Sequence, residues 1–524
     1  MNKPSKKGAI FKWLLPLILF ALCFGLSVWT YAQYGQYNLD SDMSSDMVLA
    51  QLLNEEGHIL TPNFYYSNEL NLLSPVLVYQ LGLRLFASWH AARTFSIGVL
   101  LLMMAAALVY MARGAGISLG AALLCAACLV LPVTGFQAFT LIYGSFYSMW
   151  AALTFLEVGL ILRMKKRPLE PILLAVLGLL GGLSGVRMLM VCAAPLMAAS
   201  LLTFFLEARR TEQAGEILRL PSLPLLAGSA VLSVCTYAGY LISTNILSKS
   251  YHFEQFEDTL LLKLQPDMLQ DQIMALMEFF GYRAETLLLS LEGVYSLFAM
   301  VLPILGAASI LLLLRMNLSA RERLLALFMQ VALLLGIVIN VLTLYDPADS
   351  PYAYAVSYYM PAALLLVLSV FWMLDRFRCR WQVMRIVPML VGVALFVVGF
   401  NTYRDQDVIK YEDERSQIAQ LLVEEGATQG FATYWYANVL TELSDGKIEA
   451  YMVEDWDTGR VGKWLQRVDH TQKDPEGKIF AIFSAQDYEN GVPGCDEEHV
   501  IYSSDKAFVC VYENVQEFYA LRDS

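Results

Sequence analysis

Residues 10–31, IFKWLLPLILFALCFGLSVWTY, and residues 38–60, NLDSDMSSDMVLAQLLNEEGHIL, follow each other near the start of the chain and determine its fold class. The first stretch is long and apolar enough to cross a bilayer core of ~30 Å as a helix, which takes about 20 residues. Lysines precede it, it is too long for a signal-peptide core, and it lacks an A-x-A cleavage site. We therefore predict an uncleaved anchor, followed by an acidic loop outside the membrane.

Ten further apolar stretches follow this anchor. The eleven predicted spans are roughly 10–31, 93–112, 117–134, 143–162, 171–186, 188–206, 222–245, 293–314, 324–344, 354–374 and 386–401. The fold class that they predict is an all-α polytopic membrane bundle.

The composition divides the chain into two parts. Of the 524 residues, 57% are hydrophobic and 16% are charged, with a mean hydropathy of +0.51. Soluble domains carry about 25% charged residues, so a soluble globular enzyme, a disordered chain and a nucleic-acid-binding protein are excluded. Residues 402–524 hold 25 acidic and 11 basic residues, whereas residues 1–401 hold 23 and 25. We predict a membrane domain at 1–401 and a soluble acidic domain at 402–524.

The basic residues predict the orientation, because loops on the cytoplasmic side carry an excess of Lys and Arg. With the N-terminus inside, 19 of the 25 basic residues before position 402 fall on the inner side. The remaining six are Arg84, Arg93, Arg187, Lys249, Lys263 and Arg283. An odd number of spans then places the C-terminal domain outside the cytoplasm.

Three regions on the outer side are long, namely 32–92, 246–292 and 345–353 with their flanking helix ends. Counting 72–89 as a span would reverse the charge pattern of every later loop, so we predict a helix along the outer membrane surface there. Apolar residues near helical spacing in 260–280 predict a second surface helix.

The acidic C-terminal segment is predicted to be a small α/β domain. QIAQLLVEEG is a helix that ends at Gly426, and ANVLTELSDGK is a helix that ends at Gly446. GFATYW, IEAYMV, KIFAIFS and AFVCVYE are expected to be strands, because they are rich in β-branched and aromatic residues.

Three aspartates crowd the exit of the first span. Asp42 and Asp46 are four residues apart, so they share a face if MSSDMVLAQLLNEEG is helical. By themselves they allow two interpretations: Asp40 and its neighbours cap a helix, or the carboxylates form a catalytic site.

The order of motifs in this loop resembles that of the GT-C class of integral-membrane glycosyltransferases, which includes the protein O-mannosyltransferases and the bacterial aminoarabinose transferase of lipid A. An acidic cluster follows the first span, a helix with Ala50 follows the cluster, and an aromatic stretch leads to a helix that starts at Ser74-Pro75-Val76-Leu77. The stretch SYYMPAALLL at 357–366 is similar to the Arg-Tyr-x-x-Pro segment of the class, with Ser357 in place of the Arg. The resemblance covers the whole chain in layout and a few dozen residues in motif.

The resemblance implies an enzyme that takes a sugar from a polyprenyl-phosphate donor at the outer membrane face and passes it to a cell-envelope glycan, lipid or protein. It places Asp42 nearest the catalytic aspartate of the class. The usual Asp-Glu pair is absent, since Met43 follows Asp42, so Asp40 and Asp46 stay open as carriers of the role.

Other residues could bind the donor. Arg187, among small residues at an outer turn, and Arg93, at the start of the second span, are candidates for the donor phosphate, although each could simply snorkel to the interface. Tyr65, Tyr66 and Glu69 could line a sugar site, or the aromatics could form an interfacial belt.

No cofactor is assigned from the sequence. The five histidines show no metal-ligand spacing, so no metal site is predicted, although a divalent cation could join the acidic cluster. Cys495 and Cys510 are the two cysteines of the C-terminal segment and could pair.

Two other functions stay open. A transporter or lipid flippase would place ionisable residues in mid-membrane, and only Glu157 fits that description. A non-catalytic assembly protein for an envelope polymer would use the C-terminal domain as its working part.

Overall fold

The computed structural model describes residues 6–70, 72–164, 169–209, 217–253, 267–287, 289–342, 356–378, 386–403, 413–456, 458–492 and 494–523. The predicted outer region 345–353 lies outside these residues. The chain forms two compact units. The helical unit comprises Met1–Trp29, Gly98–Asn245 and Gln255–Val408, and the loop–tail unit comprises Thr30–Ile97, Ile246–Glu254 and Ile409–Ser524.

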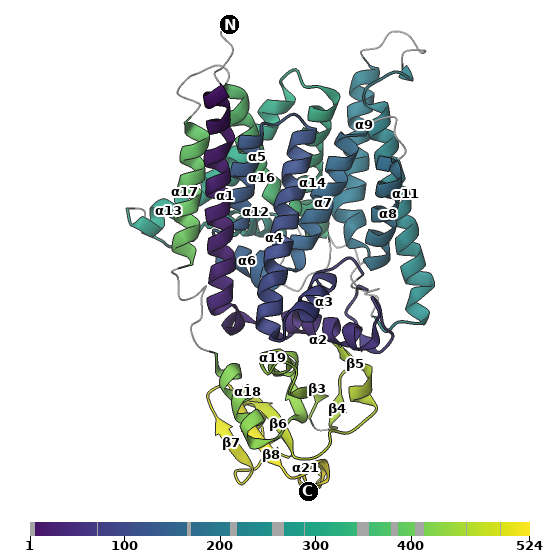
Figure 1. Ribbon diagram of the computed structural model, residues 1–524, viewed down its shortest axis with the longest axis vertical. Helices are drawn as coiled ribbons and strands as arrows, with labels where there is room; N and C mark the ends of the chain where they lie inside the picture. The colour runs from purple at the N-terminus through teal and green to yellow at the C-terminus, as the bar shows by residue number, and fades with distance from the viewer. Residues whose placement is uncertain are drawn as a thin grey trace. The chain divides into compact units, whose positions relative to one another are not determined.

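Apolar helices make up the helical unit (Figure 1). In chain order the helices that lie wholly or partly in it are α1 Lys6–Tyr34, α4 Trp89–Gly114, α5 Leu119–Val130, α6 Gly135–Ala138, α7 Phe146–Leu162, α8 Leu169–Ser184, α9 Ala194–Ala208, α11 Leu223–Asn245, α12 Asp267–Phe279, α13 Leu291–Leu314, α14 Ala320–Leu342, α16 Met360–Arg378 and α17 Val387–Thr402. Two π-helical turns, η2 Phe139–Tyr143 and η3 Leu189–Ala193, interrupt the regular α geometry.

Within the described residues, seven helices are long and apolar enough to cross a membrane. A bent pair, Leu119–Val130 and Gly135–Tyr143, would add an eighth span, with an angle of 96° at the break. Each of the eleven predicted stretches contains an apolar helix, but α7, α8 and α17 are shorter than the seven. The polytopic helical fold is confirmed, and the count of eleven spans stays a prediction.

Helices α8 and α11 pack with their backbones in direct contact, because glycines face each other. A Cβ atom added at Gly182 would lie 1.9 Å from the carbonyl oxygen of Thr236, and one at Gly239 would lie 2.2 Å from that of Leu179. Small residues that let backbones approach closely are the usual device for helix association in a membrane.

The loop–tail unit combines residues 32–92, which are the predicted first outer loop, with the acidic C-terminal segment. Its loop elements are η1 Gly35–Asn38, α2 Ser41–Glu56, β1 Phe64–Tyr65, α3 Val76–Leu85 and η4 Leu247–Lys249. Its C-terminal elements are α18 Glu414–Glu425, β2 Gln429–Thr433, α19 Tyr434–Leu443, β3 Glu449–Asp455, β4 Arg460–Val461, β5 Gln466–Arg467, η7 Val468–Thr471, β6 Ile479–Ser484, α20 Ala485–Glu489, β7 Val500–Ser503, β8 Ala507–Tyr512 and α21 Val515–Arg522.

Six C-terminal strands form one sheet in the order β4-β3-β2-β6-β8-β7 (Figure 1). The pairs β2–β3 and β2–β6 are parallel, and the others are antiparallel. Side chains alternate along each strand, so Ala432 packs with α18 and α19 on one face, whereas Phe431 packs with α21 on the other. The predicted α/β content of the C-terminal segment is confirmed, except that helix α19 begins at Tyr434, inside the predicted strand GFATYW.

The first outer loop is hydrogen-bonded into the C-terminal segment. Strand β1 pairs antiparallel with β5, so Phe64 lies opposite Arg467. The Trp89 backbone N–H donates to Oδ1 of Asp445 at 2.7 Å. The predicted domain boundary between residues 401 and 402 stays a prediction. The loop and the C-terminal segment nevertheless belong to the same compact unit.

Helices are present where surface helices were predicted. Helix α3 follows Pro75, and α12 occupies the second half of the 260–280 stretch; residues 254–266 lie outside the described part. Gly82 of α3 is required for close packing, because a Cβ atom there would lie 2.6 Å from the carbonyl oxygen of Ala92 on α4.

The thiols of Cys495 and Cys510 lie 3.2 Å apart. We expect them to form a disulfide in protein taken from its native membrane under oxidising conditions, where a closed loop of this length contributes roughly 3 kcal/mol. Mass spectrometry after alkylation without reduction checks this, with the buried Cys125 and Cys128 of α5 as free-thiol controls. Alkylation of both Cys495 and Cys510 would contradict the prediction.

Candidate functional site: an acidic cluster held by a buried ion pair

Helix α2 carries the acidic cluster. Asp40 is its N-cap residue, and Oδ1 of Asp40 accepts a hydrogen bond from the Met43 backbone N–H at 2.8 Å. The helix ends at Gly57, whose φ of 71° is the left-handed conformation that glycine adopts without strain. Asp42 lies in the first turn and Asp46 one turn later, so the predicted helix and its shared face are confirmed.

The three carboxyl groups differ in exposure. Asp40 and Asp42 are half-buried, whereas only 5% of Asp46 is exposed. Asp40 is already engaged as a helix cap, which was the simpler of the two interpretations of its position. Asp42 is therefore the member of the cluster that combines partial access with a side chain outside the capping bond.

Arg93, on the first turns of α4, lies fully buried beside the cluster. Its guanidinium forms a two-pronged ion pair with Glu442 of α19, with Nε–Oε1 at 2.6 Å and Nη2–Oε2 at 2.7 Å. Nη2 also donates to the Met43 carbonyl at 2.8 Å, and Nη1 donates to the Tyr79 hydroxyl at 3.2 Å. Arg93 thus joins α2, α3 and α19 around one charge.

One face of α19 meets the acidic helix. Tyr434, Asn438 and Glu442 recur every fourth residue, so they project from the same side. The Tyr434 hydroxyl donates to Oδ1 of Asp42, and the Tyr434 carbonyl accepts from the Ser41 hydroxyl. The loop and the C-terminal segment therefore share one site within the loop–tail unit.

Burial raises the pKa of all three aspartates. The pKa of Asp40 rises to about 6, with the Met43 N–H opposing the rise. Burial raises the pKa of Asp42, and the hydrogen bond from Tyr434 lowers it again. The pKa of Asp46 rises to about 7 despite the nearby charge of Arg93. Carboxyl groups whose pKa is raised by burial are candidates for proton transfer.

No group of three or more His, Cys, Asp or Glu side chains in the described ranges could hold a metal ion. The divalent cation considered from the sequence gains no support from this geometry.

The two tyrosines predicted to line a sugar site form hydrogen bonds within the protein. Tyr66 is buried, donates to the Thr61 carbonyl at 2.9 Å and accepts from the Thr61 N–H at 3.2 Å. Tyr65 bonds Thr471 at 3.1 Å, and its ring lies 5.2 Å from that of His252. Glu69 is half-buried. Their role toward a sugar stays a prediction.

Arg187 belongs to the helical unit, where the chain turns at Gly185 from α8 toward α9. Its guanidinium lies against three aromatic rings, at 5.4 Å from Tyr147, 5.6 Å from Trp150 and 5.9 Å from Tyr358. Such rings hold a cation over their faces. At this turn, which was predicted to lie on the outer side, the Arg187 guanidinium is therefore surrounded by aromatic side chains.

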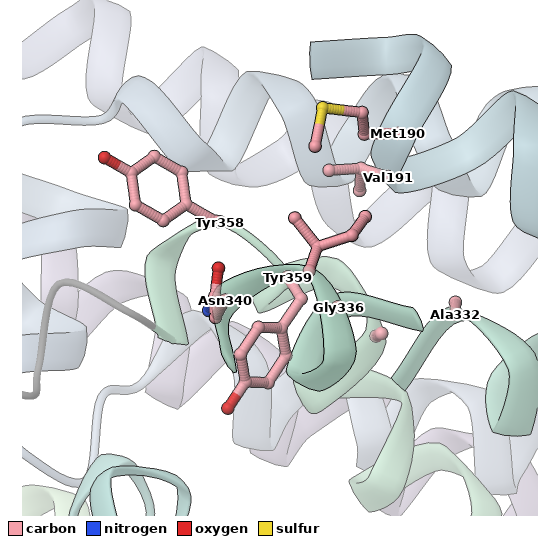
Figure 2. Close-up of a pocket in the computed structure, with 9 residues that line it drawn as sticks. Met190, Val191, Ala332, Gly336, Asn340, Tyr358 and Tyr359 are labelled. Carbon is pink, nitrogen blue, oxygen red and sulfur yellow. The ribbon is translucent and has the colours of Figure 1, made fainter. Parts of the chain in front are cut away.

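A small pocket of about 30 Å³ lies close to this turn in the sequence. Met190 and Val191 of η3 line one side (Figure 2). Helix α14 supplies Asn340, and the turn before α16 supplies Tyr358 and Tyr359. Tyr358 contributes both to the pocket and to the aromatic group around Arg187. Most of the atoms that line the pocket are apolar.

Sequence reasoning missed Tyr434 and Glu442. Tyr434 lies in the stretch GFATYW, which was predicted to be a strand and to which no site residue was assigned. The signal that could have found them is the recurrence of polar side chains at 434, 438 and 442 on one face of a mainly apolar helix. Polar side chains in such a pattern indicate that this face contacts polar groups.

Removing one partner of the buried ion pair should strongly destabilise the protein. We expect Glu442→Gln to lower the free energy of unfolding by about 3–5 kcal/mol, because Arg93 is then a buried charge without its counter-ion. Thermal or denaturant unfolding of the detergent-solubilised chain measures this. The matched control is Glu454→Gln, which breaks the exposed pair with Arg460 and should change stability by less than about 1 kcal/mol. Equal effects of the two changes would contradict the assigned role.

No protein-family model and no curated protein matches the sequence. Among solved structures, the chain is similar to the archaeal oligosaccharyltransferase AglB from Archaeoglobus fulgidus in complex with an inhibitory peptide and a dolichol-phosphate. The TM-score is 0.50 at 13% identity, over 89% of this chain and 69% of that chain.

Two further structures are similar at lower scores. ArnT from Cupriavidus metallidurans bound to undecaprenyl phosphate gives a TM-score of 0.44 at 12% identity, over 94% of this chain and 97% of that chain. The arabinofuranosyltransferase AftD from Mycobacteria gives 0.44 at 13% identity, over 84% of this chain and 32% of that chain. At such identities the likeness to AglB shows the fold, and this chain has the GT-C-like fold of membrane glycosyltransferases that the layout of its first outer loop predicts.

Proposed function

We propose that the protein is a glycosyltransferase that moves a sugar from a polyprenyl-phosphate donor to a cell-envelope acceptor at the outer membrane face. The observation that carries the proposal is the half-buried Asp42 carboxylate in the first helix after the first apolar span, in a chain with a GT-C-like fold. The donor, acceptor, eleven spans and outward C-terminal segment belong to this proposal.

The reaction needs a base, and Asp42 supplies it. The acceptor hydroxyl oxygen attacks the anomeric carbon of the sugar while the bond from that carbon to the phosphate oxygen breaks. The hydroxyl proton passes to the Asp42 carboxylate, and polyprenyl phosphate leaves with the bonding electrons. Asp40 is used as a helix cap and Asp46 is almost fully buried, so Asp42 is the first choice among the three.

The leaving phosphate needs a cation. Arg93 already donates to Glu442, Met43 and Tyr79, so the structure commits it to other partners. Arg187 is the first choice, because three aromatic rings surround its guanidinium and favour a cation there, and a planar guanidinium can meet a phosphate with two donors.

The transporter alternative would rest on Glu157, which is buried in α7. Glu157→Gln should leave sugar transfer unchanged if the protein is a transferase.

Replacing the base should slow transfer. We expect Asp42→Asn to reduce the rate of sugar transfer about 10²–10⁴-fold, because the amide keeps the shape but cannot accept the proton. The assay uses the full chain in lipid nanodiscs, a panel of polyprenyl-phosphate-linked sugars and isolated envelope fractions as acceptors. The control, Asp505→Asn, removes an exposed carboxylate of the C-terminal segment.

Near-normal transfer by Asp42→Asn would move the role to Asp40 or Asp46. If none of the three single changes reduces transfer, the acidic cluster is not the catalytic site and the transferase proposal is wrong.

The phosphate role of Arg187 is tested by binding. We expect Arg187→Lys to weaken the binding of undecaprenyl phosphate although the charge is kept, and Arg187→Ala to weaken it further. A snorkelling arginine would be replaced by lysine without loss, so wild-type binding by Arg187→Lys would pass the role to another outer cation. Arg460→Lys, which changes an exposed arginine of the C-terminal segment, is the matched control.

A further inference from the structure

One residue of the C-terminal segment, Tyr434, contacts the carboxyl group of the candidate base Asp42. Among the described residues, Tyr434 is the one side chain that hydrogen-bonds to the Asp42 carboxyl group, and it does so at Oδ1. Its hydroxyl comes from a helix nearly 400 residues away in sequence, and the ring is half-buried.

The backbone fixes the position of this tyrosine independently of its hydroxyl. The Ser41 hydroxyl donates to the Tyr434 carbonyl, and the Asn438 amide donates to the Leu465 carbonyl at 2.9 Å. Eight residues after Tyr434, Glu442 is bound to Arg93. Helix α19 is therefore held at both ends against the segment that carries Asp42, and the phenol has little freedom to leave it.

We propose that Tyr434 is a positioning residue for Asp42, so that the C-terminal segment completes the catalytic site: its hydroxyl holds one carboxylate oxygen and leaves the other to accept the proton of the acceptor. This role rests on the proposed function of Asp42 as the base. It assigns to the soluble segment a part in the chemistry rather than in anchoring alone.

The electrostatics give the contact a measurable consequence. Burial of Asp42 favours its protonated form, and a hydroxyl that donates to the carboxylate favours the ionised form. The other charged groups around the site are Asp40 and Asp46 on α2, Arg93 on α4, Arg415 on α18 and Glu442 on α19. None of them is changed when only the Tyr434 hydroxyl is removed.

Labelling with dicyclohexylcarbodiimide tests the role without any substrate, because this apolar reagent reacts with protonated carboxyl groups. The full chain in nanodiscs is labelled over a range of pH, and peptide mass spectrometry follows the adduct on Asp42, with Asp42→Asn as the blank. We expect Tyr434→Phe to move the midpoint of labelling upward by about one to two pH units, as the loss of a hydrogen bond to a charged group implies. The sign follows because the ionised form loses its donor.

Tyr436→Phe is the matched control, since it removes a hydroxyl from the same helix on the side that packs against the sheet. Its midpoint should equal that of the wild type. An unchanged midpoint in Tyr434→Phe, or an equal shift in both variants, would overturn the proposal.

A second variant keeps the fold. Replacing Tyr434 by 3-fluorotyrosine retains the ring and hydroxyl and makes the phenol a stronger donor, so the midpoint should move downward. A purely structural tyrosine would leave it in place, which would also overturn the proposal. Because labelling needs no transfer, the result is separate from the proposed function: a shifted midpoint together with normal transfer by Asp42→Asn would retain the contact and reject the base.

Discussion

The buried pair between Arg93 and Glu442 is the interaction on which the loop–tail unit depends. A guanidinium without exposure is tolerated only when its donors are used, and here they bind a carboxylate, a carbonyl and a hydroxyl. Those three partners lie on α19, α2 and α3. The charge of one residue therefore fixes the mutual placement of three helices, two from the first outer loop and one from the C-terminal segment.

That placement sets the properties of the acidic cluster. Asp46 lies beside a cation whose charge is already balanced by Glu442, so burial outweighs attraction and the pKa of Asp46 rises to about 7. Asp42, one turn earlier, is less enclosed and receives a hydroxyl. Burial raises the pKa of both carboxyl groups, and the rise is opposed at Asp46 by the charge of Arg93 and at Asp42 by the hydroxyl of Tyr434.

The helical unit obeys a different constraint. Apolar side chains gain little from meeting one another where lipid is equally apolar, so close packing decides which helices associate. Glycines between α8 and α11 bring backbones together, and the turn at Gly185 then presents Arg187 to aromatic rings. Helix α8, which precedes the turn, makes the close contacts with α11, and η3, which follows the turn, lines the small apolar pocket.

The sequence by itself determined the helical membrane fold, the α/β character of the C-terminal segment, the helix that carries Asp42 and Asp46, and the resemblance to the GT-C class. These features depend on local patterns: apolar length, strand composition, a capping aspartate and a terminal glycine. Only the tertiary structure decided that Glu442 balances Arg93, that Tyr434 meets Asp42 and that β1 pairs with β5. Each of these joins residues about 350 to 400 positions apart, and no periodicity in one segment encodes which distant segment will satisfy its buried polar groups.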